Sequence, residues 1–208
     1  MKLTLLLISG LSFLATGVEA AAAPTPSPMP LPPAWPCIDV TLKSVGWQMI
    51  SFTCIDDDDH TLSILQSASW KVDDKVLSRD QSLIFATYTG SEWVGSLKRF
   101  SYASGYKVFF SGAAGSSIEQ RGRPQLPVEE VVLPTGWSWM GHAPLVSHYI
   151  SSVITDVNTT FNVDDQIKTR SGSRVDFTTY TGSKFQGGLY ELEPGIGYEV
   201  KVKKGVTF

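Results

Sequence analysis

The side chains of this sequence that could do chemistry are three histidines and several clustered aspartates. The histidines are His60, His142 and His148, and the longest acidic run, residues 56–59, stands directly before His60. A hydrolytic site needs a nucleophile, a base and an orienting group within hydrogen-bond reach, yet no Gly-x-Ser-x-Gly segment marks a serine as nucleophile. We expect His142 and His148 to be surface or capping residues. The sequence favours a protein without enzymatic activity over a secreted hydrolase using His142, or His60 with the aspartates.

The acidic run offers Asp56, Asp58 and His60 as weak candidates for metal ligands. Calcium takes six to eight oxygen ligands from a loop with glycine at its sharp turn and a distant glutamate, and this run has neither feature. The favoured interpretation is a solvated loop whose last aspartate caps a following helix. No metal and no cofactor are therefore expected.

Two aspartate pairs, Asp73-Asp74 and Asp164-Asp165, are the only carboxylates at corresponding positions of a sequence repeat described below. Glycosidases use paired carboxylates across a cleft, but neighbouring residues at the start of a strand point to opposite faces. The pairs are therefore interpreted as turns that precede a strand.

The elements that must position these residues occur twice. Residues 85–97, Phe-Ala-Thr-Tyr-Thr-Gly-Ser-Glu-Trp-Val-Gly-Ser-Leu, correspond without a gap to residues 177–189, Phe-Thr-Thr-Tyr-Thr-Gly-Ser-Lys-Phe-Gln-Gly-Gly-Leu. Further correspondences join residues 46–50 to 136–140, 72–76 to 163–167, and 105–108 to 197–200. Self-similarity at a fixed period identifies duplicated units. The period fits two copies of a small domain, and the histidines recur in neither.

Each copy reads as five short strands and one helix. The helix is expected after residue 60 in the first copy, and in the second copy the apolar residues Val146, Tyr149, Ile150, Val153, Ile154 and Val157 fall on one helix face. Thr-Gly-Ser at 89–91 and at 181–183 reads as a hairpin turn. The predicted fold class is α+β, dominated by β-strands, with two tandem copies of a small antiparallel sheet or SH3-like barrel. Strands are expected over residues 47–52, 75–78, 83–89, 93–100 and 106–110, and over 137–141, 166–170, 174–181, 185–192 and 198–203.

The aromatic residues are the candidates for ligand contacts. Recurring rings usually fill the core of small β-domains, and those that recur here are Trp47, Trp137, Tyr88, Tyr180, Tyr106 and Tyr198. Trp93 and Phe185 follow a turn, where a ring can be partly exposed to stack on a sugar or to anchor a protein partner. Packing in the core is the favoured alternative for both. Trp70 and Trp139 have no aromatic counterpart and are weaker candidates.

The N-terminal residues predict secretion. A lysine, an apolar run over residues 3–14 and small residues before Ala20 are typical of a cleaved signal peptide, residues 1–20, which is too short to span a bilayer. The proline-rich residues 21–36 predict an extended linker. A net charge of −3 without a basic cluster argues against nucleic acid and anionic membranes as partners.

Secretion gives two further expectations. In an oxidising compartment, Cys37 and Cys54 are expected to form a disulfide. Asn158 begins an Asn-Thr-Thr sequon, which is a glycosylation site if the host is eukaryotic.

The repeated motifs resemble a known family. They are Gly-Trp-x-Trp-Met-Gly (136–141), Asp-x-Ile-Lys (165–168), Phe-x-x-Tyr (177–180) and Gly-x-Leu-x-x-Leu-x-Pro-Gly-x-Gly-Tyr (187–198). This pattern resembles a tandem repeat module of secreted and cell-surface proteins in bacteria and microalgae. The resemblance implies an extracellular appendage with no assigned catalytic activity.

Together these observations predict a domain order and a function. Module 1 is expected at residues 37–112, a connector at 113–130 and module 2 at 131–208. The leading hypothesis is a secreted, non-catalytic binding or adhesion protein whose ligand is a glycan, a matrix component or a surface protein. The alternative is a structural component of a cell wall or extracellular assembly.

Overall fold

A computed structural model describes residues 37–55, 62–79, 82–124, 131–155 and 161–207. The predicted signal peptide, the proline-rich linker, the run Asp56–His60 with its metal candidates and the sequon at Asn158 lie outside these residues. Ala34–Phe208 forms one compact unit.

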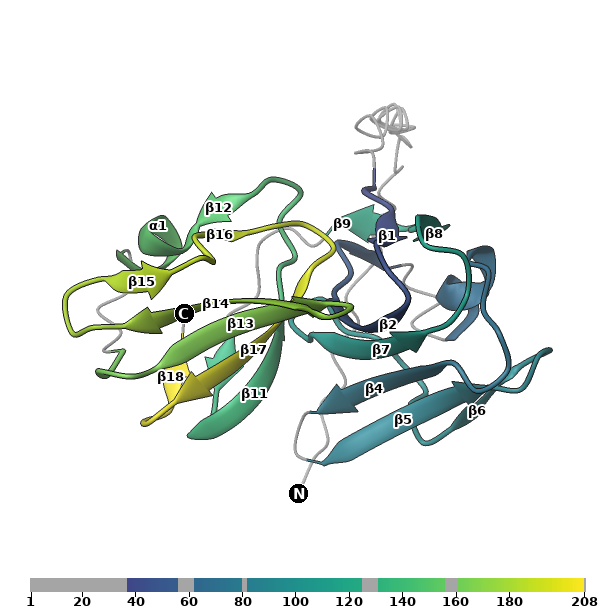
Figure 1. Ribbon diagram of the computed structural model, residues 1–208, viewed down its shortest axis with the longest axis horizontal. Coiled ribbons are helices and arrows are strands. Elements are labelled where there is room, and N and C mark those ends of the chain that lie inside the picture. The colour runs from purple at the N-terminus through teal and green to yellow at the C-terminus, as the bar shows by residue number, and fades with distance from the viewer. Residues whose placement is uncertain (1–36, 56–61, 80–81, 125–130, 156–160, 208) are drawn as a thin grey trace, which may run out of the picture. The chain divides into compact units, whose positions relative to one another are not determined.

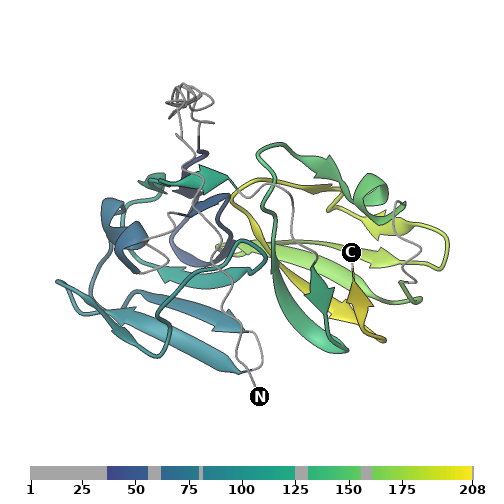
Figure 2. The same cartoon turned by 180° about the vertical axis from the view of Figure 1, so that it is seen from behind.

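Antiparallel strands dominate this unit, as the sequence predicts. The main sheet has ten strands. Five pair in the order β2 (Gly46–Ile50), β7 (Tyr106–Phe110), β4 (Lys75–Arg79), β5 (Leu83–Tyr88) and β6 (Trp93–Gly95). The other five are β11 (Gly136–Gly141), β17 (Gly197–Val202), β13 (Gln166–Ser171), β14 (Arg174–Tyr180) and β15 (Phe185–Gly187). The two sets join where Ser171 pairs with Gln48, and the sheet curls within each set (Figures 1 and 2).

The expected hairpins connect β5 to β6 and β14 to β15. In the first turn the Thr89 N–H donates to the carbonyl of Glu92, and in the second the Thr181 N–H donates to the carbonyl of Lys184. Gly90 and Gly182 have φ of +104° and +95°, a region that glycine reaches without strain.

Four two-stranded pairs flank the main sheet. They are β1 (Val40–Leu42) with β8 (Ser116–Ile118), β3 (Cys54–Ile55) with β9 (Arg123–Pro124), β10 (Val132–Leu133) with β18 (Val206–Thr207), and β12 (His148–Tyr149) with β16 (Glu191–Leu192). Strands β8 and β9 lie in the segment expected to be a connector. They are tied to the first core, where Oε1 of the buried Gln120 accepts hydrogen bonds from the backbone of Thr53 and Cys54.

The helices differ from the sequence prediction within the described residues. The first is a 3₁₀ turn, η1 (Leu62–Ser67), and the second is α1 (Ile150–Thr155). Val146 and Tyr149 were expected on the helix but precede it and are exposed, because Tyr149 pairs with Glu191 as a strand and the Ile150 N–H donates to the carbonyl of Tyr190. The apolar spacing alone therefore placed the start of this helix too early.

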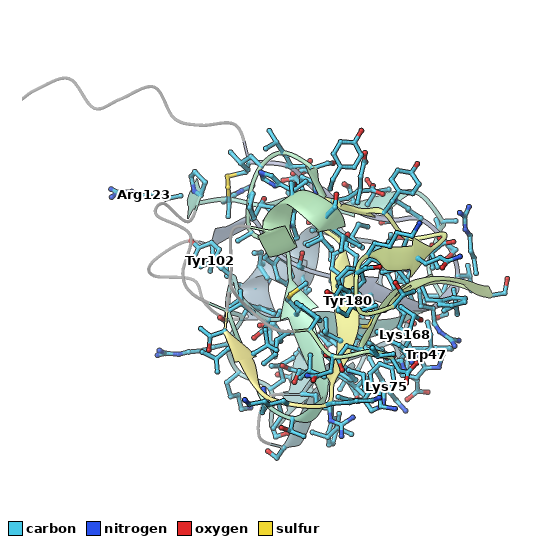
Figure 3. The ribbon with its side chains drawn as sticks, turned by 90° about the vertical axis from the view of Figure 1, so that its left-hand side faces the viewer. Trp47, Lys75, Tyr102, Arg123, Lys168 and Tyr180 are labelled. Carbon is cyan, nitrogen blue, oxygen red and sulfur yellow. A yellow bond between two sulfur atoms is a disulfide. The ribbon has the colours of Figure 1, made fainter. Side chains whose placement is uncertain are left out.

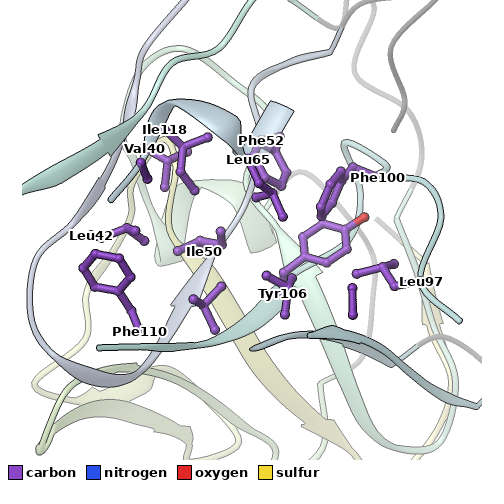
Figure 4. Close-up of a cluster of buried hydrophobic side chains, with 14 of the residues drawn as sticks. Val40, Leu42, Ile50, Phe52, Leu65, Leu97, Phe100, Tyr106, Phe110 and Ile118 are labelled. Carbon is purple, nitrogen blue, oxygen red and sulfur yellow. The ribbon is translucent and has the colours of Figure 1, made fainter. Parts of the chain in front are cut away.

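Two clusters of buried hydrophobic side chains lie on the inward face of the sheet strands. The first surrounds Tyr106 and Phe52 and is shown in Figure 4. The second surrounds Tyr198 and Met140. In each cluster the tyrosine hydroxyl accepts a hydrogen bond of 2.6 Å, from the Ser101 N–H to Tyr106 and from the Glu193 N–H to Tyr198. Tyr106 and Tyr198 are core residues, as predicted.

The cysteine pair forms the expected disulfide. Cys37 and Cys54 are bonded, with their Cα atoms 5.8 Å apart, within the usual range for such bridges. The bridge fastens the start of the described chain to strand β3. Among the helices of the described residues, none has the length and apolar character needed to cross a membrane.

Candidate functional site

The outward side of the main sheet carries an unusual set of side chains. Strand alternation buries Tyr106 and Val108 and turns Lys107 outward on β7, and it turns Trp137 and Trp139 outward on β11. On β2, Trp47 is half-buried, whereas Gln48 next to it is buried. The three tryptophans are half-buried rather than buried. We call the surface formed by Trp47, Lys107, Trp137, Trp139, Lys168 and Glu199 the tryptophan face.

This position corrects one expectation. Trp47 and Trp137 were expected in the core because they recur, but their rings lie against lysine side chains on the tryptophan face. Figure 3 places Trp47 and Lys168 on the same side of the molecule, away from Tyr102 and Arg123. Recurrence here marks an outward position on the strand rather than a core position.

Lys107 is the centre of the tryptophan face. Its Nζ lies 5.8 Å from the centroid of the Trp47 ring and 5.9 Å from that of Trp139. The same Nζ donates to Oε1 of Glu199 at 3.2 Å. A cation within about 6 Å of an indole centroid is attracted to the ring, so Lys107 links two tryptophans and a carboxylate.

Lys168 repeats this arrangement on β13, which pairs with β17, the strand of Glu199. Its Nζ lies 4.1 Å from the Trp137 ring centroid and 2.7 Å from Oε2 of Glu199. Glu199 therefore accepts from two lysines at once. Burial by itself would raise the pKa of Glu199, but the hydrogen bond from Lys168 and the charge of Lys107 outweigh it and hold that pKa below its usual value.

A groove of about 600 Å³ opens beside Lys107. It is lined by Trp47, Leu77, Arg79, Ser82, Leu83, Lys107, Trp139 and Arg170. The lining comes from both repeated segments, since Trp139 and Arg170 belong to the second. Aromatic walls with a few charged groups are typical of ligand sites, and the cationic groups here favour an anionic ligand group.

The two arginines of the groove are available to a ligand. Both side chains are exposed, on β4 and β13. Within the described residues, neither Arg79 nor Arg170 forms an ion pair. The groove therefore holds cationic charge that the described carboxylates leave without a counterion.

The predicted ligand contacts, Trp93 and Phe185, lie elsewhere, in two aromatic clusters. Trp93 packs edge-on against Trp70 at 4.9 Å and against Tyr88 at 5.3 Å, and it borders a small pocket of about 210 Å³. Phe185 packs against Phe161 at 5.2 Å and Tyr180 at 5.1 Å. Both rings are half-buried, so the alternatives of core packing and ligand contact both stay open for them.

Phe161, which packs against Phe185, is the aromatic counterpart of Trp70 that the sequence interpretation did not identify. Phe161 stands four residues before Asp165, as Trp70 stands four residues before Asp74, and each ring contacts the aromatic residue after the hairpin. The correspondence of residues 72–76 to 163–167 extends to this pair, since each ring stands two residues before its segment.

The paired aspartates are structural, as expected. Asp73 and Asp164 adopt φ of 72° and 71° in turns. Asp74 and Asp165 are fully buried, and each accepts one backbone hydrogen bond from its own turn and one from the residue after β7 or β17. They fasten the turn to the sheet instead of facing a substrate.

The histidine prediction is wrong for His142, which is buried. Its Nε2 lies 3.0 Å from the carbonyl of Val146 and 3.3 Å from Nδ1 of His148. Burial lowers the pKa of His142, the hydrogen bond to Val146 opposes this, and the charge of His148 adds to it. Within the described ranges, no group of three histidine, cysteine, aspartate or glutamate side chains could hold a metal ion.

The contact between the repeated segments is reciprocal. Ile50 and Ile196 form an isolated antiparallel β-bridge. Their counterparts in the repeat, Met140 and Ser104, form another. Likewise the Ser51 N–H donates to the carbonyl of Gly195 at 3.0 Å, and the Gly141 N–H donates to the carbonyl of Ala103 at 2.9 Å. Contacts exchanged in this way are those of a two-fold interface.

The groove residues carried a signal that sequence reasoning did not use. Lys107 stands between the apolar Tyr106 and Val108. On the other strand, Trp137 and Trp139 alternate with Ser138 and Met140. The alternation identifies outward positions on each strand. The meeting of Lys107 with Trp139 and Glu199 depends on the contact between the two segments, which the sequence does not specify.

Comparison with known proteins identified no relative of this chain. No protein-family model matches the chain, and neither the curated proteins nor the solved structures that were compared contain a significant match.

Proposed function

We propose that this chain is a secreted, non-catalytic binding protein built from two copies of one β-rich module, with its ligand on the tryptophan face. The observation that carries the proposal is the position of Lys107, between the Trp47 and Trp139 rings at the edge of a groove of about 600 Å³. Aromatic rings on the inward face of the sheet would only pack in the core. Rings held outward by cations present flat apolar surfaces to a partner.

The duplication is supported by equal contacts at corresponding positions. The turn aspartates, the tyrosine hydroxyls and the order of the five sheet strands agree between the two halves. The reciprocal contact between the halves gives a reason for keeping both copies, because the groove takes residues from each. An SH3-like barrel with one helix is the proposed form of the module.

Secretion is supported by the N-terminal sequence and by the disulfide. A non-catalytic role is supported at His142 and His148 only, because His60 lies outside the described residues. His142 is buried against His148 and the carbonyl of Val146, where a substrate would have to displace existing contacts.

A structural role in an extracellular assembly is the second candidate. It is favoured by apolar side chains on the outward positions of β5 and β14, where Phe85 is 48 % exposed and Phe177 54 % exposed. Sedimentation over a wide concentration range separates the candidates. A monomer at high concentration argues against assembly, whereas growing oligomers that dissociate on Phe85→Ser with Phe177→Ser support it.

The test of the binding proposal is an array of glycans and matrix proteins, probed with protein secreted from cells expressing the full chain. Trp139→Ala and Trp47→Ala are compared with Trp93→Ala and Phe185→Ala. Loss of binding in the first pair alone supports the tryptophan face. Loss in the second pair alone moves the site to the aromatic clusters, and a blank array with folded protein rejects the binding proposal.

A further inference from the structure

The chemistry of the groove identifies a class of ligand. We propose that the groove binds an acidic polysaccharide whose charged groups are the carboxylates of uronic acids. This inference rests on the proposed function and deepens it, since it names what the tryptophan face recognises.

Charge is the first argument. The described lining contains three cationic side chains, Arg79, Lys107 and Arg170. Lys107 is shared with Glu199, but the two arginines form no ion pair with any described residue. Arginine presents a planar fork of N–H donors that matches a carboxylate in a bidentate geometry. The groove thus offers two such forks to an anionic ligand.

The indole rings are the second argument. The ring centroids of Trp47 and Trp139 lie 5.8 and 5.9 Å from the Lys107 Nζ, and Leu77 and Leu83 add apolar surface to the groove. A pyranose ring has an apolar face and a polar edge, so it can lie on an indole while its carboxylate reaches an arginine. The combination of rings and cations in one groove suits a chain of acidic sugars.

The backbone argues against an extended acidic peptide. Peptides are often bound by strand addition at a free sheet edge. At Leu77 and Lys107 the strands that line the groove are paired on both sides, and β11 is covered where the Gly105 N–H donates to the Trp139 carbonyl. Recognition beside Leu77, Lys107 and Trp139 therefore rests on side chains, which is how rings and carboxylates of a glycan are bound.

The test uses polygalacturonate, its methyl ester and poly-L-glutamate with the secreted full-length protein. The methyl ester keeps the sugar chain and removes the charge, whereas poly-L-glutamate keeps the charge and removes the sugar. We expect binding of polygalacturonate alone, weakened about tenfold by Arg79→Gln or Arg170→Gln and abolished by Trp139→Ala. Arg123→Gln is the matched control, because it removes an equal charge on the side opposite Trp47 (Figure 3) and should bind like the unmodified protein.

Each other outcome overturns the inference in its own way. Equal binding of the methyl ester would show a neutral glycan site, and equal binding of poly-L-glutamate would show a site for acidic protein; both would leave the proposed function intact. Tighter binding of dextran sulfate than of polygalacturonate would exclude uronate as the preferred group. No binding of polygalacturonate by protein with an unchanged near-ultraviolet spectrum would reject the inference, and only a blank array as well would reject the proposed function.

Discussion

Lys107 and Glu199 stand at the same position of the repeated segment and are paired with each other at 3.2 Å. One copy reads Gly-Tyr-Lys-Val and the other Gly-Tyr-Glu-Val. A duplicated unit that packs against itself brings equal positions together, and equal charges there would repel. The difference of one residue turns that repulsion into an ion pair that holds the tryptophan face together.

Reversing one charge should expose this relationship. Lys107→Glu places two carboxylates in contact at a site where both partners are largely buried. We expect a loss of about 1–3 kcal/mol in the free energy of unfolding, measured with urea. The double variant Lys107→Glu, Glu199→Lys should recover part of the loss. Equal stability of the single variant and the unmodified protein would contradict the pairing.

Acid should weaken the same contact. The pKa of Glu199 is lowered in the folded state, so its stabilising contribution is complete above the unfolded value of about 4.3 and is lost as the pH falls through the folded value. The stability difference between the unmodified protein and Glu199→Gln should therefore be largest near neutral pH and shrink below about pH 4.3. A difference that is constant across this window would show that Glu199 does not act through its charge.

Two glycines set the distance between the repeated segments. A Cβ on Gly105 would lie 2.6 Å from the carbonyl oxygen of Met140, and one on Gly197 would lie 2.3 Å from that of Ile50. Gly105→Ala or Gly197→Ala should each lower stability by about 1–3 kcal/mol through overpacking. Gly188→Ala is the control, because its Cβ meets nothing within 4 Å. If thermal unfolding shifts equally in all three variants, the contact between the segments is not as described.

The buried histidine predicts a second pH dependence. The pKa of His142 is lowered on folding, so the native state takes up fewer protons than the unfolded chain. The resulting stability is complete above about pH 6.5, the unfolded value, and is lost as the pH falls through the folded value. Unfolding free energies measured below about pH 6.5 should fall less steeply in His142→Gln. The contact is contradicted if NMR shows His142 titrating at or above the usual value.

Much of this fold follows from local sequence patterns. The strands around Tyr106 and Tyr198 were predictable from alternation, and the hairpins from Thr-Gly-Ser, because both depend on neighbouring residues alone. The apolar pattern predicts a helix that begins before Ile150, because it takes no account of the strand pairing of Tyr149 with Glu191.

The candidate site was less predictable for a physical reason. Trp47 was assigned to the core from its recurrence, although the strand on which it lies has two faces and either can carry an aromatic ring. The groove depends on Trp139 and Arg170 meeting Lys107 across the reciprocal contact of the two segments. Such a contact is made by backbone atoms of Ile50, Met140 and their partners; the recurring Gly105 and Gly197 permit the close approach but do not identify the strand that approaches.

The most direct test of the tryptophan face is an NMR titration that follows the side-chain N–H signals of the six tryptophans. The ligand is the strongest binder on the array, and Trp→Phe variants assign the signals. We predict that the signals of Trp47 and Trp139 shift on binding, while those of Trp70 and Trp93 keep their positions. Shifts confined to Trp70 and Trp93 would contradict the proposal and place the ligand at the aromatic cluster beside η1.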